Sequence, residues 1–242
     1  HDYISKLLPV YLLKPYTSNG SFLSRFADWS VMAVKNNSKK KISLAGQSVA
    51  DEKDQTAFIN VYGRVRGGES LVAGIVPSSA MFAVSVSTSD IRSYEDSYIS
   101  YLDAAGRQDR FNSVPKALKD SLGVTPQQWF EKLAVKEVAK ADMIVDDAVV
   151  SLIFVRPGKE NADLILKGSG LGSVKEARNV HPNPYQGYVA SILGGLFSAD
   201  ESHAVYRNGW IVFGPESALE SIGGDNLKSE LAALDLSVPE KG

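Results

Sequence analysis

One dipeptide near the end of the chain constrains its fold more than any other feature. Asn208-Gly209 separates two largely apolar runs, Ala204–Arg207 and Trp210–Phe213. Both central residues of a type I′ turn need a positive φ angle, and Asn followed by Gly satisfies this requirement best. The sequence therefore predicts a tight antiparallel hairpin here.

Two further pairs of runs show the same organisation. Trp29–Val34 and Ile42–Val49 flank a polar, lysine-rich tip, and Lys136–Val145 and Ala148–Arg156 flank Asp146-Asp147. In the first pair apolar and polar residues alternate with a period of two, which is typical of half-buried strands, and the second pair consists of strand-like runs around a turn. We expect a hairpin from each pair, and we interpret the lysines as a solvated turn that discourages edge pairing.

Helical signals lie between the hairpins. A run beginning at Ser89 carries aromatic residues at helical spacing and ends at Gly106, and Thr125 with Gln128 forms a capping-box pattern. Regular strand–helix–strand alternation, which would predict a parallel sheet, is missing. The pattern predicts an α+β fold: antiparallel sheet built from hairpins, with helices packed on one face. We expect one domain over residues 1–242, a fragment of a larger protein, with a candidate subdivision near residue 74.

Composition excludes several classes of function. The 242 residues include no cysteine, which rules out disulfides, thiolate metal ligands and a cysteine nucleophile. A formal net charge of −2 disfavours a nucleic-acid binder, since such proteins usually carry a basic excess. No apolar stretch is long enough to cross a membrane as a helix. We therefore expect no nucleic-acid partner and no transmembrane helix.

Catalytic signatures are also missing. Gly46–Ala50 resembles a nucleophile elbow but lacks the second glycine, and Gly168–Gly172 resembles a phosphate-binding loop but has Ser173 where the dinucleotide fingerprint has glycine. The residues around His203 are adjacent on an extended segment, so their side chains would point in opposite directions. We predict no catalytic residue, no metal site and no cofactor, and we interpret the glycine-rich segment as a flexible loop.

Four aromatic residues gather around one loop and the last hairpin: Tyr185, Tyr188, Tyr206 and Trp210. Their rings could stack on sugars or contact a partner, because Tyr and Trp combine a large rigid surface with a polar tip. The alternative is that Tyr188 and Trp210 belong to the core. These four residues are our candidate ligand-binding set.

Several short stretches resemble a family of Bacteroidetes cell-envelope proteins of unknown function, often described as lipoproteins. The resembling stretches are Phe26–Val31, Ile42–Gly46, Ile75–Ala80, Tyr94–Gly106, Ile192–Ser198 and Gly209–Leu219. The family has no established activity, so the resemblance transfers no functional residue. It implies a periplasmic or outer-membrane location and a larger parent protein upstream of His1, where a lipid anchor would lie.

Three functional hypotheses follow, and the third is a nucleotide-dependent enzyme that uses the glycines at 168–172. The first is a non-enzymatic envelope protein, a binding or scaffold module whose partner is an unidentified envelope protein or glycan. It predicts an exposed apolar or aromatic patch. The second is a carbohydrate-binding or carbohydrate-processing protein that uses the aromatic region 185–210. It requires a groove with at least two exposed rings.

Overall fold

The computed structural model describes residues 26–38, 41–63, 65–106, 125–158, 179–183, 186–194 and 197–222. The chain divides into two compact units. Unit 1 comprises residues 1–65 and 93–110, and unit 2 comprises residues 66–92 and 111–242. Segments from two separate parts of the sequence therefore form each unit.

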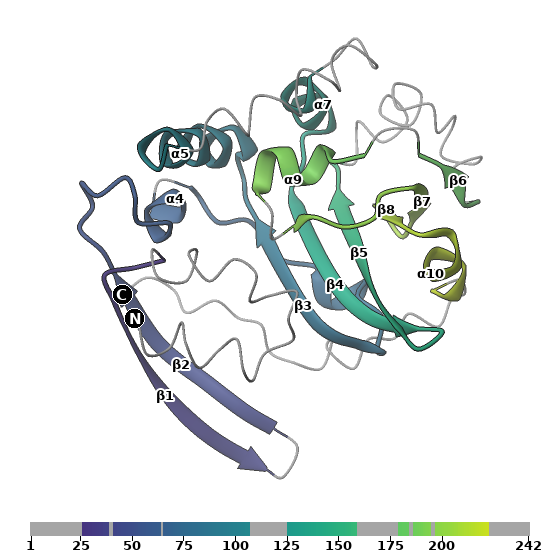
Figure 1. The fold of residues 1–242 in the computed structure, drawn as a ribbon, viewed down its shortest axis with the longest axis horizontal. Coiled ribbons are helices and arrows are strands. Elements are labelled where there is room, and N and C mark those ends of the chain that lie inside the picture. Colours follow the sequence, from purple (N-terminus) through teal and green to yellow (C-terminus); the bar gives the residue numbers. More distant parts are fainter. Residues whose placement is uncertain are drawn as a thin grey trace. The chain divides into compact units, whose positions relative to one another are not determined.

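Unit 2 is built on a six-stranded sheet with the strand order β3-β4-β5-β8-β7-β6 (Figure 1). Its strands are β3 (Ala80–Ser87), β4 (Glu137–Val145), β5 (Ala148–Arg156), β6 (His181–Pro182), β7 (His203–Arg207) and β8 (Trp210–Gly214). Every neighbouring pair is antiparallel. The α+β class predicted from the sequence is confirmed.

Tight turns join two of these pairs as the sequence predicts. Asn208 and Gly209 have φ angles of 49° and 85° between β7 and β8. Asp146 and Asp147 have φ angles of 49° and 61° between β4 and β5. Positive φ at both central residues is the requirement of a type I′ turn, whose twist matches that of the flanking strands.

Helices lie against both faces of the sheet, where the sequence analysis expects them on one. Leu219 of α10 (Glu216–Ser221) belongs to a buried cluster with Leu152 and Val212, and we call this side the α10 face. The short 3₁₀ helix η1 (Val72–Gly74) contributes Val72 to the same cluster.

The opposite side of the sheet is the α7 face. Phe213 alternates with Val212 along β8 and so points to this side, where its ring centroid lies 6.3 Å from that of Trp129 in α7 (Pro126–Leu133). Helix α9 (Tyr188–Leu193) contacts α7. The predicted capping box is present, since Thr125 accepts from the Gln128 backbone N–H and the Gln128 side chain accepts from the Thr125 N–H.

Unit 1 contains a second, two-stranded antiparallel sheet of β1 (Trp29–Ser38) and β2 (Lys41–Val49), which confirms the first predicted hairpin. Helices α4 (Ile59–Gly63) and α5 (Ile91–Ala104) follow it along the chain. The first two residues of α5, Ile91 and Arg92, belong to unit 2, and the rest of the helix belongs to unit 1. The aromatic stripe of α5 packs around Phe58, whose centroid lies 5.3 Å from that of Tyr101. Tyr94, Tyr98 and Tyr101 are all buried, so this stripe belongs to the core of unit 1.

Some predicted features lie outside the described residues. These are the glycine-rich loop Gly168–Gly172 and the lysine tip at residues 39 and 40. The prediction of one domain with a subdivision near residue 74 stays a prediction. Among the described residues, no helix is long and apolar enough to cross a membrane.

Candidate functional site

The structure describes two of the four aromatic residues that the sequence singles out. Trp210 is only 4% exposed and belongs to the buried cluster of the α10 face. Tyr206 is half-buried and pairs with Ile211, so its ring points to the α7 face. These two rings therefore lie on opposite faces of the sheet. Tyr185 and the side chain of Tyr188 lie outside the described residues, so a ligand site built on this region stays a prediction.

A buried ion pair holds the segment before η1 against the sheet. Glu137 of β4 is fully buried, and its carboxylate accepts hydrogen bonds from the Ser70 hydroxyl and the Leu71 backbone N–H, each at 2.7 Å. Arg156 Nε lies 3.3 Å from the same carboxylate, and its Nη2 donates to the Glu69 carbonyl at 2.6 Å. A carboxylate engaged in this way has a structural role, because a buried charge is stable only when it is paired and hydrogen-bonded.

The guanidinium of Arg156 also lies 5.8 Å from the centroid of the Trp210 ring. This spacing is typical of a cation–π contact. Trp210 thus contributes to the support of the buried ion pair, which accounts for its position without a ligand.

A second polar cluster lies on the α7 face. The Ser151 hydroxyl donates to Asp142 Oδ1 at 2.6 Å, and Lys140 Nζ lies 3.9 Å from that oxygen and donates to the Ser198 carbonyl at 3.1 Å. Burial raises the pKa of Asp142, an effect that the Ser151 hydrogen bond opposes, and burial lowers the pKa of Lys140. Both groups therefore favour their neutral forms more than exposed groups would.

Next to this cluster, three large apolar side chains are open to solvent: Phe82, Ile144 and Val149, which are 37%, 54% and 51% exposed. We call them the apolar patch. Ile144 and Val149 are directly opposite each other, and Phe82 is opposite Asp142, two residues from Ile144. Cross-strand neighbours and diagonal neighbours of this kind lie within reach of one another. The patch is a continuous surface that the sequence analysis did not locate.

The described helices of the α7 face do not cover the end of the sheet near the Asp146-Asp147 turn, where the apolar patch lies. Trp129 packs on Phe213 of β8, whereas the patch lies on β3, β4 and β5 near the Asp146-Asp147 turn. Along β5, the buried Ile153 and the exposed Val149 point to the same face. Within the described part of the chain, the helices cover one end of this face only.

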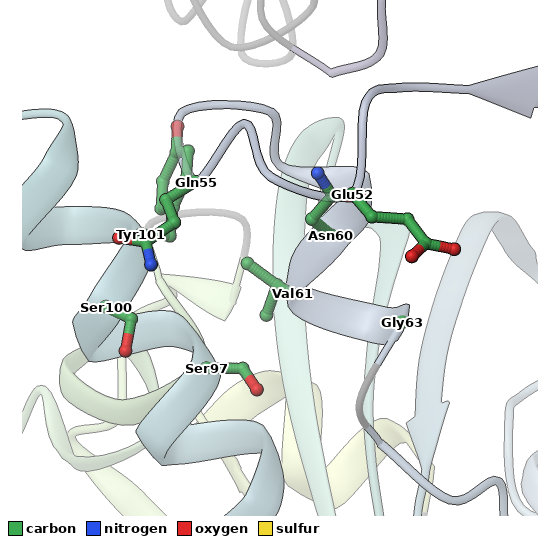
Figure 2. A pocket seen from close by; sticks show the side chains of 8 residues that line it. All are labelled: Glu52, Gln55, Asn60, Val61, Gly63, Ser97, Ser100 and Tyr101. Carbon is green, nitrogen blue, oxygen red and sulfur yellow. The ribbon is translucent and has the colours of Figure 1, made fainter.

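Unit 1 holds a small polar hollow of about 250 Å³ between α4, α5 and the loop before α4. Figure 2 shows Ser97 and Ser100 on α5, Val61 pointing from α4 toward them, and the Glu52 carboxylate turned away from α5. Ligand sites are usually larger and more apolar, with several polar groups that converge. Here Ser100 donates to the Asp96 carbonyl of its own helix, and Asn60 donates to the backbone of the loop. The hollow therefore serves local structure.

Metal-binding chemistry finds no support in the region that the structure describes, where no group of three or more His, Asp or Glu side chains converges. His203 contacts Ser202 and lies 3.8 Å from Glu216, a partly exposed pair on β7 and α10. Comparison with known proteins found no matching family model, no matching curated protein and no matching solved structure.

Proposed function

We propose that this chain is a non-catalytic binding module of a bacterial cell envelope and that the apolar patch is its contact surface. The observation that carries the proposal is the exposure of Phe82, Ile144 and Val149 side by side on one sheet face. Contiguous apolar side chains left open to water are typical of interaction sites. The envelope location comes from the resemblance and is part of the proposal.

The partner is a protein surface that combines apolar side chains with basic ones. Asp146 and Asp147 are exposed in the turn that adjoins the patch, so the patch has an acidic margin. An acidic margin disfavours anionic lipid headgroups and favours Lys or Arg at the rim of a partner. Among the described residues, the patch has a single aromatic ring, whereas a sugar-stacking platform would present more.

The buried polar groups support a binding role over a catalytic one. Glu137, Arg156 and Ser70 stabilise the fold, and the half-buried Ser151 hydroxyl donates a hydrogen bond to Asp142. Among the described residues, no imidazole hydrogen-bonds to Asp142, so Ser151 lacks the serine–histidine pair typical of acyl-transfer sites.

Site-specific photo-crosslinking in the source bacterium tests the proposal. A photoreactive residue at Val149 should give a discrete product in the envelope fraction. The matched control is Ala148, which is exposed on the same strand but points to the other face.

Two further variants define which product counts as specific. The combined substitution Phe82→Ser and Ile144→Ser should abolish the product from position 149, and Asp146→Lys with Asp147→Lys should weaken it. A chain found only in the cytosol, or equal products from positions 148 and 149, would contradict the proposal.

A further inference from the structure

The two edges of the six-stranded sheet differ sharply. At one edge, β6 has only two residues, one of which is Pro182. At the other, β3 has eight residues, Ala80–Ser87, with no charged residue and no proline (Figure 1). Natural sheets protect their edges with short strands, prolines and charges. β6 has the first two of these features, whereas β3 has none of the three and is irregular only at its first residues, where a β-bulge lies.

β3 is also unusually accessible. None of its residues is buried, and Met81 and Phe82 are 46% and 37% exposed. A bulge interrupts its pairing with β4 between Ala80 and Phe82, so regular pairing extends from Phe82 to Ser87. This regular part is an uncharged template for another strand.

The backbone contacts at the end of β3 show which groups face outward. The Ser87 carbonyl accepts from the Gly68 N–H, and Gly67 forms a bridge with Thr88 on the side away from β4. Outward-facing residues alternate along a strand. Ala83 and Ser85 therefore direct both their N–H and C=O groups to the free edge, where no strand of the described residues pairs with them.

We propose that β3 pairs with β3 of a second copy of this chain, antiparallel about a twofold axis at Val84. In this register Ala83 faces Ser85 of the other copy, and each of these pairs exchanges two backbone hydrogen bonds. Val84 faces its own counterpart, and Phe82 faces Val86. The two sheets become one continuous sheet.

The register makes β3 complementary to itself. Phe82, Val84 and Val86 all point to the α7 face, so each residue on that side meets an apolar partner. A strand with no charge carries no like-charge repulsion against an identical strand, and an antiparallel pair about a twofold satisfies the symmetry of a closed dimer. The inference goes beyond the proposed function, because edge pairing uses the free backbone of β3 and leaves Ile144 and Val149 available to another protein.

The absence of cysteine from the sequence permits a direct test of the axis. Val84 would lie in a non-hydrogen-bonded pair, where Cα atoms are about 4.5 Å apart, close enough for a disulfide. In Val84→Cys, mild oxidation at low micromolar protein should give a covalent dimer, detected by non-reducing electrophoresis and intact mass.

Val86→Cys is the matched control, since Val86 is half-buried on the same strand and the same face. In this register the two copies of residue 86 are four strand positions apart, or about 13 Å. This variant should stay monomeric under the same oxidation. Equal crosslinking of both variants, or crosslinking of neither, would overturn the proposal.

Sedimentation of the cysteine-free chain over a concentration series gives an independent measurement. The wild type should dimerise reversibly, and Ser85→Pro should weaken association at least tenfold, because it removes a donor from the free edge. Proline is tolerated at an edge where its nitrogen faces away from the neighbouring strand, so circular dichroism should show an unchanged fold. A monomer at all concentrations, or a dimer that Ser85→Pro does not affect, would contradict edge pairing. The crosslink at Val149 is a separate readout, so either result can fail without the other.

Discussion

At the scale of single residues, two turns reach the same geometry with different side chains. Asn208-Gly209 and Asp146-Asp147 both have two positive φ angles. Glycine adopts positive φ without steric cost, whereas a residue with a Cβ atom does so at a cost. The Asp146-Asp147 turn adds the repulsion of two adjacent carboxylates.

Replacement of Asp147 by Gly should therefore stabilise the protein. We expect the free energy of unfolding to rise by about 1 kcal/mol, because the left-handed conformation costs a non-glycine residue about that much. Urea unfolding measures the difference. The matched change in the other turn, Gly209→Ala, should lower stability by a similar amount, and a destabilised Asp147→Gly variant would show that the aspartates contribute more than their backbone cost.

Asp142 should make stability depend on pH. Because burial raises its pKa in the folded state, the carboxyl group contributes stability below its ordinary pKa of 3.8 and loses that contribution as the pH rises through the raised pKa. Asp142→Asn keeps an acceptor for Ser151 and cannot ionise. Its free energy of unfolding relative to wild type should therefore increase as the pH rises over this interval.

Denaturant unfolding at a series of pH values from 3 to 7 measures this difference. Ser151→Ala is the control, since it keeps the ionisable group and should retain a pH-dependent contribution. A constant difference between Asp142→Asn and wild type would show that the pKa of Asp142 is not raised in the folded protein.

At the scale of elements, local chemistry made the hairpins and the capped helix predictable. Asn208-Gly209 and the capping box of Thr125 carry their own geometric requirements, and the structure confirms both. The apolar patch could not be predicted in this way. Val149 and Ile153 are both apolar and point to the same face, but only Ile153 is buried. The difference depends on where the helices pack, which is a tertiary property.

The same limit applies to Trp210 and Glu137. The Asn208-Gly209 turn predicted the strand that contains Trp210, but both a ligand-binding ring and a core ring fit such a strand. Glu137 looked like an ordinary polar residue at a strand start, and only the approach of Ser70, 67 positions earlier, shows its buried role. Contacts at such sequence separations leave no local signal.

Packing between β8 and α10 gives a prediction at this scale. A methyl group at Gly214 would collide with the Leu152 side chain and approach Leu219 Cδ2 at 3.6 Å. Because Leu152 and Leu219 are fully buried, neither can move without disturbing the core. Gly214→Ala should lower the free energy of unfolding by about 1–3 kcal/mol.

A double-mutant cycle separates this collision from a backbone effect. Leu152→Ala creates space beside Gly214, so it should make Gly214→Ala less harmful than it is in the wild type. Additive effects of the two substitutions would contradict the proposed collision.

At the scale of the whole molecule, each unit is discontinuous in the sequence, so a single boundary cannot separate the two units. Residues 66–92 belong to unit 2 but lie between the two segments of unit 1. A composition change marks a linker between consecutive domains, whereas here the chain leaves one unit and returns to it. The expected subdivision near residue 74 falls within this excursion, inside η1.

The two sheets should differ in local stability. The β1–β2 ribbon has only two strands, and Trp29 and Val31 on one of its faces are 50% and 63% exposed. β4 and β5 lie inside a six-stranded sheet, where Ala141 and Leu152 are fully buried. Two-stranded ribbons are marginally stable by themselves, and protection from exchange follows the free energy of local opening.

Hydrogen exchange measured by mass spectrometry should show amides of β2 exchanging at least about 100-fold faster than those of β4. Destabilisation of the unit 2 core by Leu152→Ala should accelerate exchange in β4 and β5 more than in β2, and equal acceleration in all three strands would show that the two units open as one.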